Sequence, residues 1–284
     1  MKTLSKYSAM NTQNDNLDAA SVLPHCTNTC FGHARYIYTS ATGSTNDDAH
    51  QLARQGAPHG TLVVTDKQTA GRGRQDRNWK SPPNCGIYTS LLLRPDRRPL
   101  QEAPLLGIAA AVAAVQAIAR ITQGAAQIKW PNDILLRQRK IAGILTETDI
   151  QPDGRYAVII GLGINVNTPY TALPTRIIFP ASSIQLETGH HISRPALLAA
   201  WLENMEILYQ HWHDENASAI VATWHKHAYG LGKMISIEQH GQTITGILHG
   251  MAEDGSLLLK GTTGEMIRII SGDVTATTFP THHT

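Results

Sequence analysis

The stretch GRGRQDRNW (residues 71–79) places three arginines and a tryptophan on a glycine-containing polar segment between two apolar runs. TLVVT (61–65) precedes it and IYTSLLL (87–93) follows it, and both have the β-branched and aliphatic content typical of strands. Glycine allows the backbone to approach a ligand closely, and arginine offers planar, bidentate donors suited to phosphate. The stretch therefore predicts a basic loop that could close over a nucleotide phosphate, although alone it is equally compatible with a solvated turn.

Strands and helices are expected on both sides of this loop. Upstream, residues 36–40 favour a short strand, followed by a helix that is capped by Ser44, Thr45 or Asn46 and ends near Gly56. Pro131 favours a turn that divides the next strand at residues 130–133. The remaining predictions are a hairpin of residues 140–148 and 155–167, a loop at 168–182, and helices at 102–120, 194–213 and 215–228.

After Lys233 the pattern changes to short apolar runs divided by glycine-containing turns, which is typical of a small β-barrel. The predicted fold class is therefore α+β. The predicted organisation is a poorly structured N-terminal segment (1–34), a catalytic domain (35–230), a β-barrel (233–277) and a tail (278–284).

Composition limits the classes of function. The chain has 284 residues, of which 42% are hydrophobic, so it can bury a large core. Its formal net charge is only +2, which excludes the whole-chain basic field on which non-specific nucleic-acid binding depends. The basic character is local, and neither a nucleic acid nor a membrane is an expected partner.

Three cysteines provide no disulfide framework and suit a reducing compartment. The polar N-terminus does not have the pattern of a signal peptide, and the apolar run at 105–115 is too short to cross a bilayer. These features predict a cytoplasmic protein. The histidines and cysteines of residues 25–33 match no common zinc-finger spacing, so no metal site is expected there.

Four segments gather glycine, amide and cationic residues at predicted strand ends, where pockets commonly form. They are STN (44–46), QTAGRGRQDRNW (68–79), KWPND (129–133) with RKIAGIL (139–145), and GLGINV (161–166).

In this order the four segments resemble the biotin–protein ligase family, also called biotin–[acetyl-CoA-carboxylase] ligases, over about residues 35–277. The resemblance implies a mixed-sheet catalytic domain of the biotin/lipoate ligase type and a C-terminal SH3-like β-barrel. It also implies an activity: ATP and biotin form biotinyl-5′-AMP, and biotin is then transferred to a lysine of a biotin carboxyl carrier protein. Mg²⁺ is expected with ATP, and the oligomeric state stays open, a homodimer included.

Such chemistry must bring two anions together, and cations placed in advance can offset their repulsion. The resemblance places Lys140 at the junction of carboxyl and α-phosphate, with Arg72 and Arg74 beside it. Asp133 would orient the acceptor amine or take its proton. Without the motif, Lys140 would be read as a solvated lysine and Asp133 as a turn carboxylate.

Biotin also needs partners for its ureido group and aliphatic walls for its chain. Trp130 and Leu162 are candidates for the walls, and a core role would explain them equally well. The biotin-binding residues implied are Ser44, Thr45, Asn46, Gln68, Gly71, Arg72, Lys140, Gly143, Leu145, Gly161 and Gly163. Gly161 and Gly163 are expected to leave room for a ligand against the strand, although a glycine there can also simply mark a bulge.

The nucleotide would be held by amide groups at the adenine, by Trp79 packed on the base, and by basic residues. The loop at 72–79 is expected to be a lid that is poorly ordered without ligand and excludes water from the acyl-adenylate. The ATP-binding residues implied are Arg72, Arg74, Arg77, Trp79, Lys129, Asn132, Lys140 and Asn165.

One position departs from the family pattern, because Asp76 stands where the loop usually has glycine. Aspartate tolerates the left-handed region better than most residues, so the turn can survive. The residues before Ser44 lack a helix-turn-helix pattern, which predicts a monofunctional ligase. The alternatives are a lipoate–protein ligase, whose glycine signature differs, and a nucleic-acid-binding module, for which residues 233–277 offer few basic or aromatic side chains.

Overall fold

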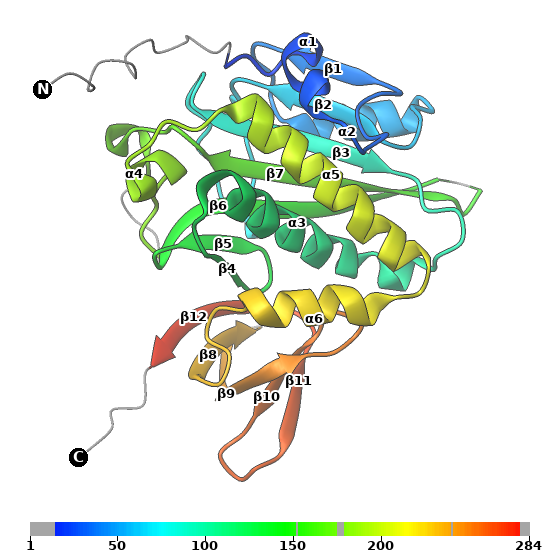
Figure 1. Cartoon of the computed structure of the whole chain (residues 1–284). Coiled ribbons are helices and arrows are strands. Elements are labelled where there is room, and N and C mark those ends of the chain that lie inside the picture. Colours follow the sequence, from blue (N-terminus) through cyan, green and yellow to red (C-terminus); the bar gives the residue numbers. More distant parts are fainter. Residues whose placement is uncertain (1–14, 152, 175–178, 240, 279–284) are drawn as a thin grey trace, which may run out of the picture.

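A seven-stranded mixed sheet forms the centre of the protein (Figure 1). The computed structural model describes residues 15–151, 153–174, 179–239 and 241–278. The strand order is β1-β2-β3-β7-β6-β5-β4, with β1 and β2 parallel and the other neighbours antiparallel. The strands are β1 (Tyr36–Thr39), β2 (Thr61–Thr65), β3 (Gly86–Leu93), β4 (Ala126–Lys129), β5 (Asp133–Leu136), β6 (Arg139–Ile150) and β7 (Tyr156–Asn165). The predicted strands and the β6–β7 hairpin are confirmed.

The two faces of the sheet carry different helices, because side chains along β7 alternate between them. Ile159 packs with Ala49 and Leu52 of α2 (Thr45–Arg54). Its neighbour Ile160 belongs to the larger core on the opposite face. That face is covered by α3 (Pro104–Thr122), α5 (Arg194–His213) and α6 (Ala217–His227) (Figure 1).

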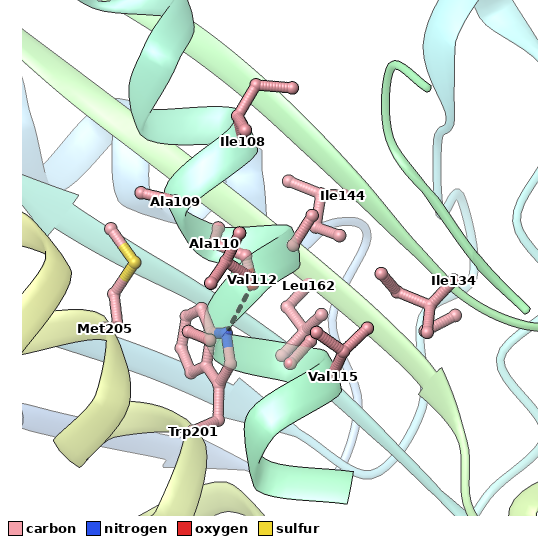
Figure 2. Close-up of a cluster of buried hydrophobic side chains, with 14 of the residues drawn as sticks. Ile108, Ala109, Ala110, Val112, Val115, Ile134, Ile144, Leu162, Trp201 and Met205 are labelled. Carbon is pink, nitrogen blue, oxygen red and sulfur yellow. Dashed lines mark hydrogen bonds between the residues drawn. The ribbon is translucent and has the colours of Figure 1, made fainter. Parts of the chain in front are cut away.

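Helix α3 is the central element of the larger core. Figure 2 shows Val112 and Val115 of α3 beside Ile144 and Leu162 of the sheet, while the indole of Trp201 in α5 donates to the carbonyl of Ala110 at 3.2 Å. Within the described residues, the segment Leu100–Thr122 alone is long and apolar enough to cross a membrane by length and composition. It is 67% buried inside the protein and packs against α5, as a core helix does.

The C-terminal domain is a five-stranded antiparallel sheet in the order β11-β10-β9-β8-β12, which confirms the predicted small β domain. Hydrogen bonds join it to the catalytic domain, including those that Arg74 and Arg77 donate to Asp273. The indole of Trp130 donates to the Gly255 carbonyl at 3.1 Å, and the Met251 amide donates to Nε2 of His225 at 3.0 Å. The strands are β8 (Met234–Gln239), β9 (Gln242–Met251), β10 (Leu257–Lys260), β11 (Met266–Ile269) and β12 (Asp273–Thr278).

The prediction of a poorly structured segment at 1–34 is wrong for residues 15–34, while residues 1–14 lie outside the described residues. This part contains α1 (Ala19–Val22) and the 3₁₀ turn η1 (Leu23–His25). Leu17, Val22 and Phe31 are fully buried in the larger core. The polar surroundings of these apolar residues concealed their role, because only long-range packing reveals it.

Short elements occupy the loops between these parts. Helix α4 (Ile184–Thr188), which was not predicted, is capped by the hydroxyl of Ser183 and ends at Gly189 with a φ of 79°. The three cysteines are free. The 3₁₀ turns are η2 (Arg74–Asp76), η3 (Leu100–Glu102) and η4 (Tyr170–Ala172).

Candidate active site

A cavity of about 370 Å³ lies on the α2 face of the sheet, beneath the loop at 71–79. All predicted site residues line it except Gly71, Lys129 and Trp130. Gly71 lies beside it and accepts a hydrogen bond from the Trp79 amide at 2.9 Å. The lining residues are Ser44, Thr45, Asn46, Gln68, Arg72, Gly73, Arg74, Arg77, Asn78, Trp79, Lys80, Thr89, Asn132, Asp133, Lys140, Gly143, Ile144, Leu145, Gly161, Leu162, Gly163, Asn165, Pro174, Phe179, Ala181 and Asp273.

One end of the cavity is polar and held by hydrogen bonds between side chains. Gln68 Oε1 accepts from the amide and hydroxyl of Thr45 at 3.0 and 3.2 Å. The hydroxyl of Ser90 lies 2.8 Å from that of Thr45 and 2.6 Å from Oδ1 of Asn46. Ser44 occupies the N-cap position of α2 but makes no capping hydrogen bond with its side chain. Its buried hydroxyl is therefore available to a ligand rather than to the helix.

The glycines of β6 and β7 allow two side chains to lie flat against the sheet. A Cβ at Gly161 would collide with the amide of Asn46. A Cβ at Gly163 would lie 2.5 Å from Cε2 of Trp79, and one at Gly143 would lie 3.2 Å from Cζ3 of the same indole. The space that these glycines were expected to leave for a ligand is thus occupied by Asn46 and Trp79.

Two lysines converge on Asp133 at the other end. Asp133 Oδ1 lies 2.5 Å from Lys140 Nζ, and Oδ2 lies 2.9 Å from Lys129 Nζ. Burial alone would raise the pKa of Asp133, but the two ammonium groups outweigh it and hold that pKa below its ordinary value. Lys140 Nζ also lies 5.6 Å from the centre of the Trp79 ring. Lys129 is buried behind Asp133, so it reaches the cavity only through that carboxylate.

The arginines of the loop are already paired with carboxylates. Arg72 holds both oxygens of Asp47 at 2.6 and 2.7 Å and lies 3.5 Å from Glu147. Arg74 and Arg77 both reach Asp273 at the start of β12, at 3.3 and 2.7 Å. The C-terminal domain therefore contributes an acidic side chain to the wall of the cavity.

The backbone of this loop adopts the left-handed conformation at the position that departs from the family pattern. Asp76 has a φ of 55°, as has Gln75, so the prediction that aspartate preserves the turn is confirmed. The loop is folded over the cavity and held by an isolated antiparallel β-bridge between the backbones of Arg72 and Asn78. Its ordering by ligand stays a prediction.

The amide residues expected at the adenine are anchored to the backbone. Asn132 Nδ2 donates to the Ile144 carbonyl at 2.8 Å, and Asn165 Nδ2 donates to the Ser182 carbonyl at 3.1 Å. Trp79 Nε1 is one of the few buried side-chain polar atoms in the described part of the chain that lack a hydrogen-bond partner. Trp130 belongs to the larger core and does not line the cavity. Leu162 belongs to the same core but also lines the cavity, as does Leu145.

Sequence reasoning missed Asp47, Ser90, Glu147 and Asp273. Glu147 follows Leu145 by two residues on the same strand face, which the period of β6 could have indicated. The other three had no such signal, and Asp273 is almost 200 residues from its partners in the chain.

Comparison with known proteins identifies similar chains. Residues 38–165 match the biotin/lipoate A/B protein ligase family, and residues 230–275 match the biotin protein ligase C-terminal domain. The chain is 40% identical to the bifunctional ligase/repressor BirA of Bacillus subtilis, over 84% of this chain and 73% of that protein. It is 32% identical to the biotin–[acetyl-CoA-carboxylase] ligase of Paracoccus denitrificans, over 80% of this chain and 94% of that protein.

A solved structure has the same fold. The biotin protein ligase of Aquifex aeolicus in complex with biotin and ATP superposes with a TM-score of 0.72 at 28% identity, over 84% of this chain and 97% of that one.

Proposed function

Because the chain belongs to the biotin/lipoate protein ligase family, we propose that it activates biotin with ATP and transfers it to a lysine of a biotin carboxyl carrier protein. In the first step a biotin carboxylate oxygen attacks the α-phosphorus, and the bond to pyrophosphate breaks. In the second, the lysine nitrogen attacks the acyl carbon, AMP leaves with the bonding electron pair, and the amine loses a proton.

The observation that carries this proposal is the arrangement of cations around the cavity. Lys140 lies at one end, and Arg72, Arg74 and Arg77 extend from the loop that covers it. Each is already oriented by a carboxylate, so little reorganisation is needed when an anionic ligand replaces or joins that partner. The uncharged end at Ser44, Thr45 and Gln68 suits a ureido group, which needs both donors and acceptors.

Asp133 is better suited to orienting Lys140 than to removing a proton. Its pKa is held low by two lysines, so the carboxylate is a weak base at neutral pH. Of the two roles expected for Asp133, taking the proton of the acceptor amine is therefore disfavoured. We propose in addition a role that was not expected: Asp133 holds the Lys140 ammonium at the position where the carboxyl and α-phosphate groups meet. Lys129 supports the same carboxylate from behind.

Further expectations follow from the same assignment. Mg²⁺ would arrive with the triphosphate, because both carboxylates that line the cavity, Asp133 and Asp273, are paired with lysine or arginine and offer no dedicated oxygen cage. The acceptor protein would be the carrier domain of acetyl-CoA carboxylase, as in the name of the Paracoccus relative. Two expectations stay predictions: that the protein acts in the cytoplasm, and that it has no repressor function.

Gly163→Ala is expected to weaken nucleotide binding about tenfold, because the added methyl group displaces the Trp79 indole that we place at the adenine. Calorimetric titration with ATP, together with tryptophan fluorescence, measures both effects. Gly43→Ala is the matched control, since a Cβ there meets nothing within 4 Å. Wild-type ATP affinity in Gly163→Ala would contradict the placement of Trp79 at the adenine.

The proposed function is tested by biotin-dependent exchange of pyrophosphate into ATP and by biotinylation of a carrier domain. We expect exchange with biotin and not with lipoate, and incorporation at one acceptor lysine. Exchange with lipoate alone would assign the chain to the lipoate branch. Oligonucleotide binding without any exchange would favour the nucleic-acid-binding alternative.

A further inference from the structure

Behind the polar end of the cavity, Glu147 of β6 contacts both the predicted biotin site and the loop. Its Oε2 accepts from Asn46 Nδ2 at 2.5 Å. Its Oε1 lies 3.5 Å from Arg72 Nη2. One carboxylate thus joins a residue at the N-terminus of α2 to the arginine that fastens the loop.

Asn46 depends on Glu147 for its orientation. Its amide lies over Gly161, where no side chain can compete for the space. Ser90 donates to its Oδ1 at 2.6 Å, and its Nδ2 donates to Glu147 and, at 3.5 Å, to the Leu145 carbonyl. Because the hydroxyl of Ser90 also contacts Thr45, rotation of Asn46 would disturb the residue that meets Gln68.

His50 lies one turn along α2 and is bracketed by two carboxylates of β6. Its Nδ1 lies 3.2 Å from Asp149 Oδ2, and its Nε2 lies 3.6 Å from Glu147 Oε2. Arg54 of the same helix also reaches Asp149 at 2.9 Å. A protonated imidazole can therefore hold Glu147 and Asp149 together, whereas a neutral one can donate to only one of them and turns an unprotonated nitrogen toward the other.

We propose that Glu147 is a positioning residue for biotin activation, which orients Asn46 and Arg72 together and is itself held in place by protonated His50. This inference rests on the proposed function. It adds a link between biotin binding and loop closure that runs through one carboxylate, and it gives that link a dependence on pH.

The direction of the pH dependence follows from the surroundings of His50. The Glu147 carboxylate, 3.6 Å away, raises the pKa of His50 above its ordinary value of 6.5, burial opposes this, and the hydrogen bond with Asp149 adds to it. The pairing with His50 in turn lowers the pKa of Glu147 to about 2, so this carboxylate stays ionised. The charged groups around His50 are Glu147 and Asp149 of β6, Arg54 and Asp47 of α2, and Arg72 of the loop.

A group whose pKa is raised by folding contributes fully below its ordinary, unfolded pKa and loses its contribution as the pH rises through its folded pKa. Biotin should therefore bind tightest below the raised pKa of His50 and more weakly above it. The change is expected to be about fivefold between pH 6 and pH 8.5, a range in which biotin itself stays ionised.

The test is calorimetric titration of the full chain with biotin across this pH range. In Glu147→Gln the dissociation constant should rise about tenfold, because glutamine keeps an acceptor oxygen but removes the negative charge that Asn46, Arg72 and His50 face. In His50→Gln the affinity should no longer change with pH, since glutamine keeps a donor but does not titrate. The lifetime of bound biotinyl-AMP should also shorten in Glu147→Gln, because Arg72 loses a partner.

His213→Gln is the matched control, because His213 is also bracketed by two carboxylates, Asp96 and Asp214, but its partners lie at the end of α5 and not beside Asn46 and Arg72, as Glu147 does. It should keep the wild-type affinity and the wild-type pH dependence. Wild-type affinity in Glu147→Gln, or an unchanged pH dependence in His50→Gln, would overturn this inference and leave the proposed function standing. If Glu147→Gln did not fold, the pH dependence of biotin affinity in His50→Gln would decide whether the inference holds. If the unaltered chain bound no biotin, the proposed function would fall as well.

Discussion

Replacing Lys140 with alanine is expected to slow biotin adenylation by a factor of about 10³, the effect of removing one preorganised charge from a transition state. Lys140 is the lysine that lines the cavity at Asp133, and its ammonium lies 2.5 Å from that carboxylate. Negative charge accumulates at this point when a carboxylate attacks the α-phosphorus. Initial rates of pyrophosphate exchange at saturating ATP and biotin measure the effect.

The fold should survive this substitution. Asp133 keeps Lys129 as a partner at 2.9 Å, so no buried carboxylate is left without a cation. The free energy of unfolding should change by less than about 1 kcal/mol, as for a partly exposed ion pair. The exposed Lys67 provides the control, and Lys67→Ala should retain full exchange activity. An exchange rate within about tenfold of the wild type in Lys140→Ala would contradict its assigned role.

Replacing Arg194 with methionine should destabilise the protein by about 3–5 kcal/mol, the cost of breaking a buried ion pair by removing one partner. Arg194 is the first residue of α5 and is only 2% exposed. Its guanidinium lies 2.9 Å from Asp15, 2.8 Å from Asp66 and 3.1 Å from the Gly86 carbonyl. Methionine would fill much of the volume but would leave Asp66 buried without a cation.

Chemical denaturation followed by circular dichroism measures this loss. Arg155→Met is the control, since Arg155 pairs with Asp153 at an exposed turn and should leave the midpoint unchanged. A loss below about 1 kcal/mol in Arg194→Met would mean that the ion pair behaves like a surface pair. Such a result would also contradict the conclusion that residues 15–34, which include the Arg194 partner Asp15, form a structural part of the fold.

The elements around the cavity could be predicted because their signals are local. The continuous apolar run of β7 and the turn residues between β6 and β7 favour a hairpin without reference to any other segment. The site residues were also predictable, since they lie in four short motifs at strand ends, and all but Gly71, Lys129 and Trp130 line one cavity. The N-terminal segment was not, because Leu17 and Val22 are isolated apolar residues in a polar stretch.

The interaction partners of the site residues could not be predicted from the sequence either. Nothing near Arg74 or Arg77 in the chain indicates that Asp273 will pair with both, and nothing near Asn46 indicates Glu147. The glycines at 161 and 163 were expected to admit a ligand, yet the atoms nearest to them belong to Asn46 and Trp79.

The sequence by itself determined the strands, most of the helices, the small C-terminal β domain and the residues that gather at the cavity, since these depend on periodicity, turn chemistry and short motifs. Only the tertiary structure decided which carboxylate holds each cation and how residues 15–34 pack. Such contacts join segments separated by up to about 200 residues, and the energy of an ion pair depends on distance and burial that no local pattern encodes.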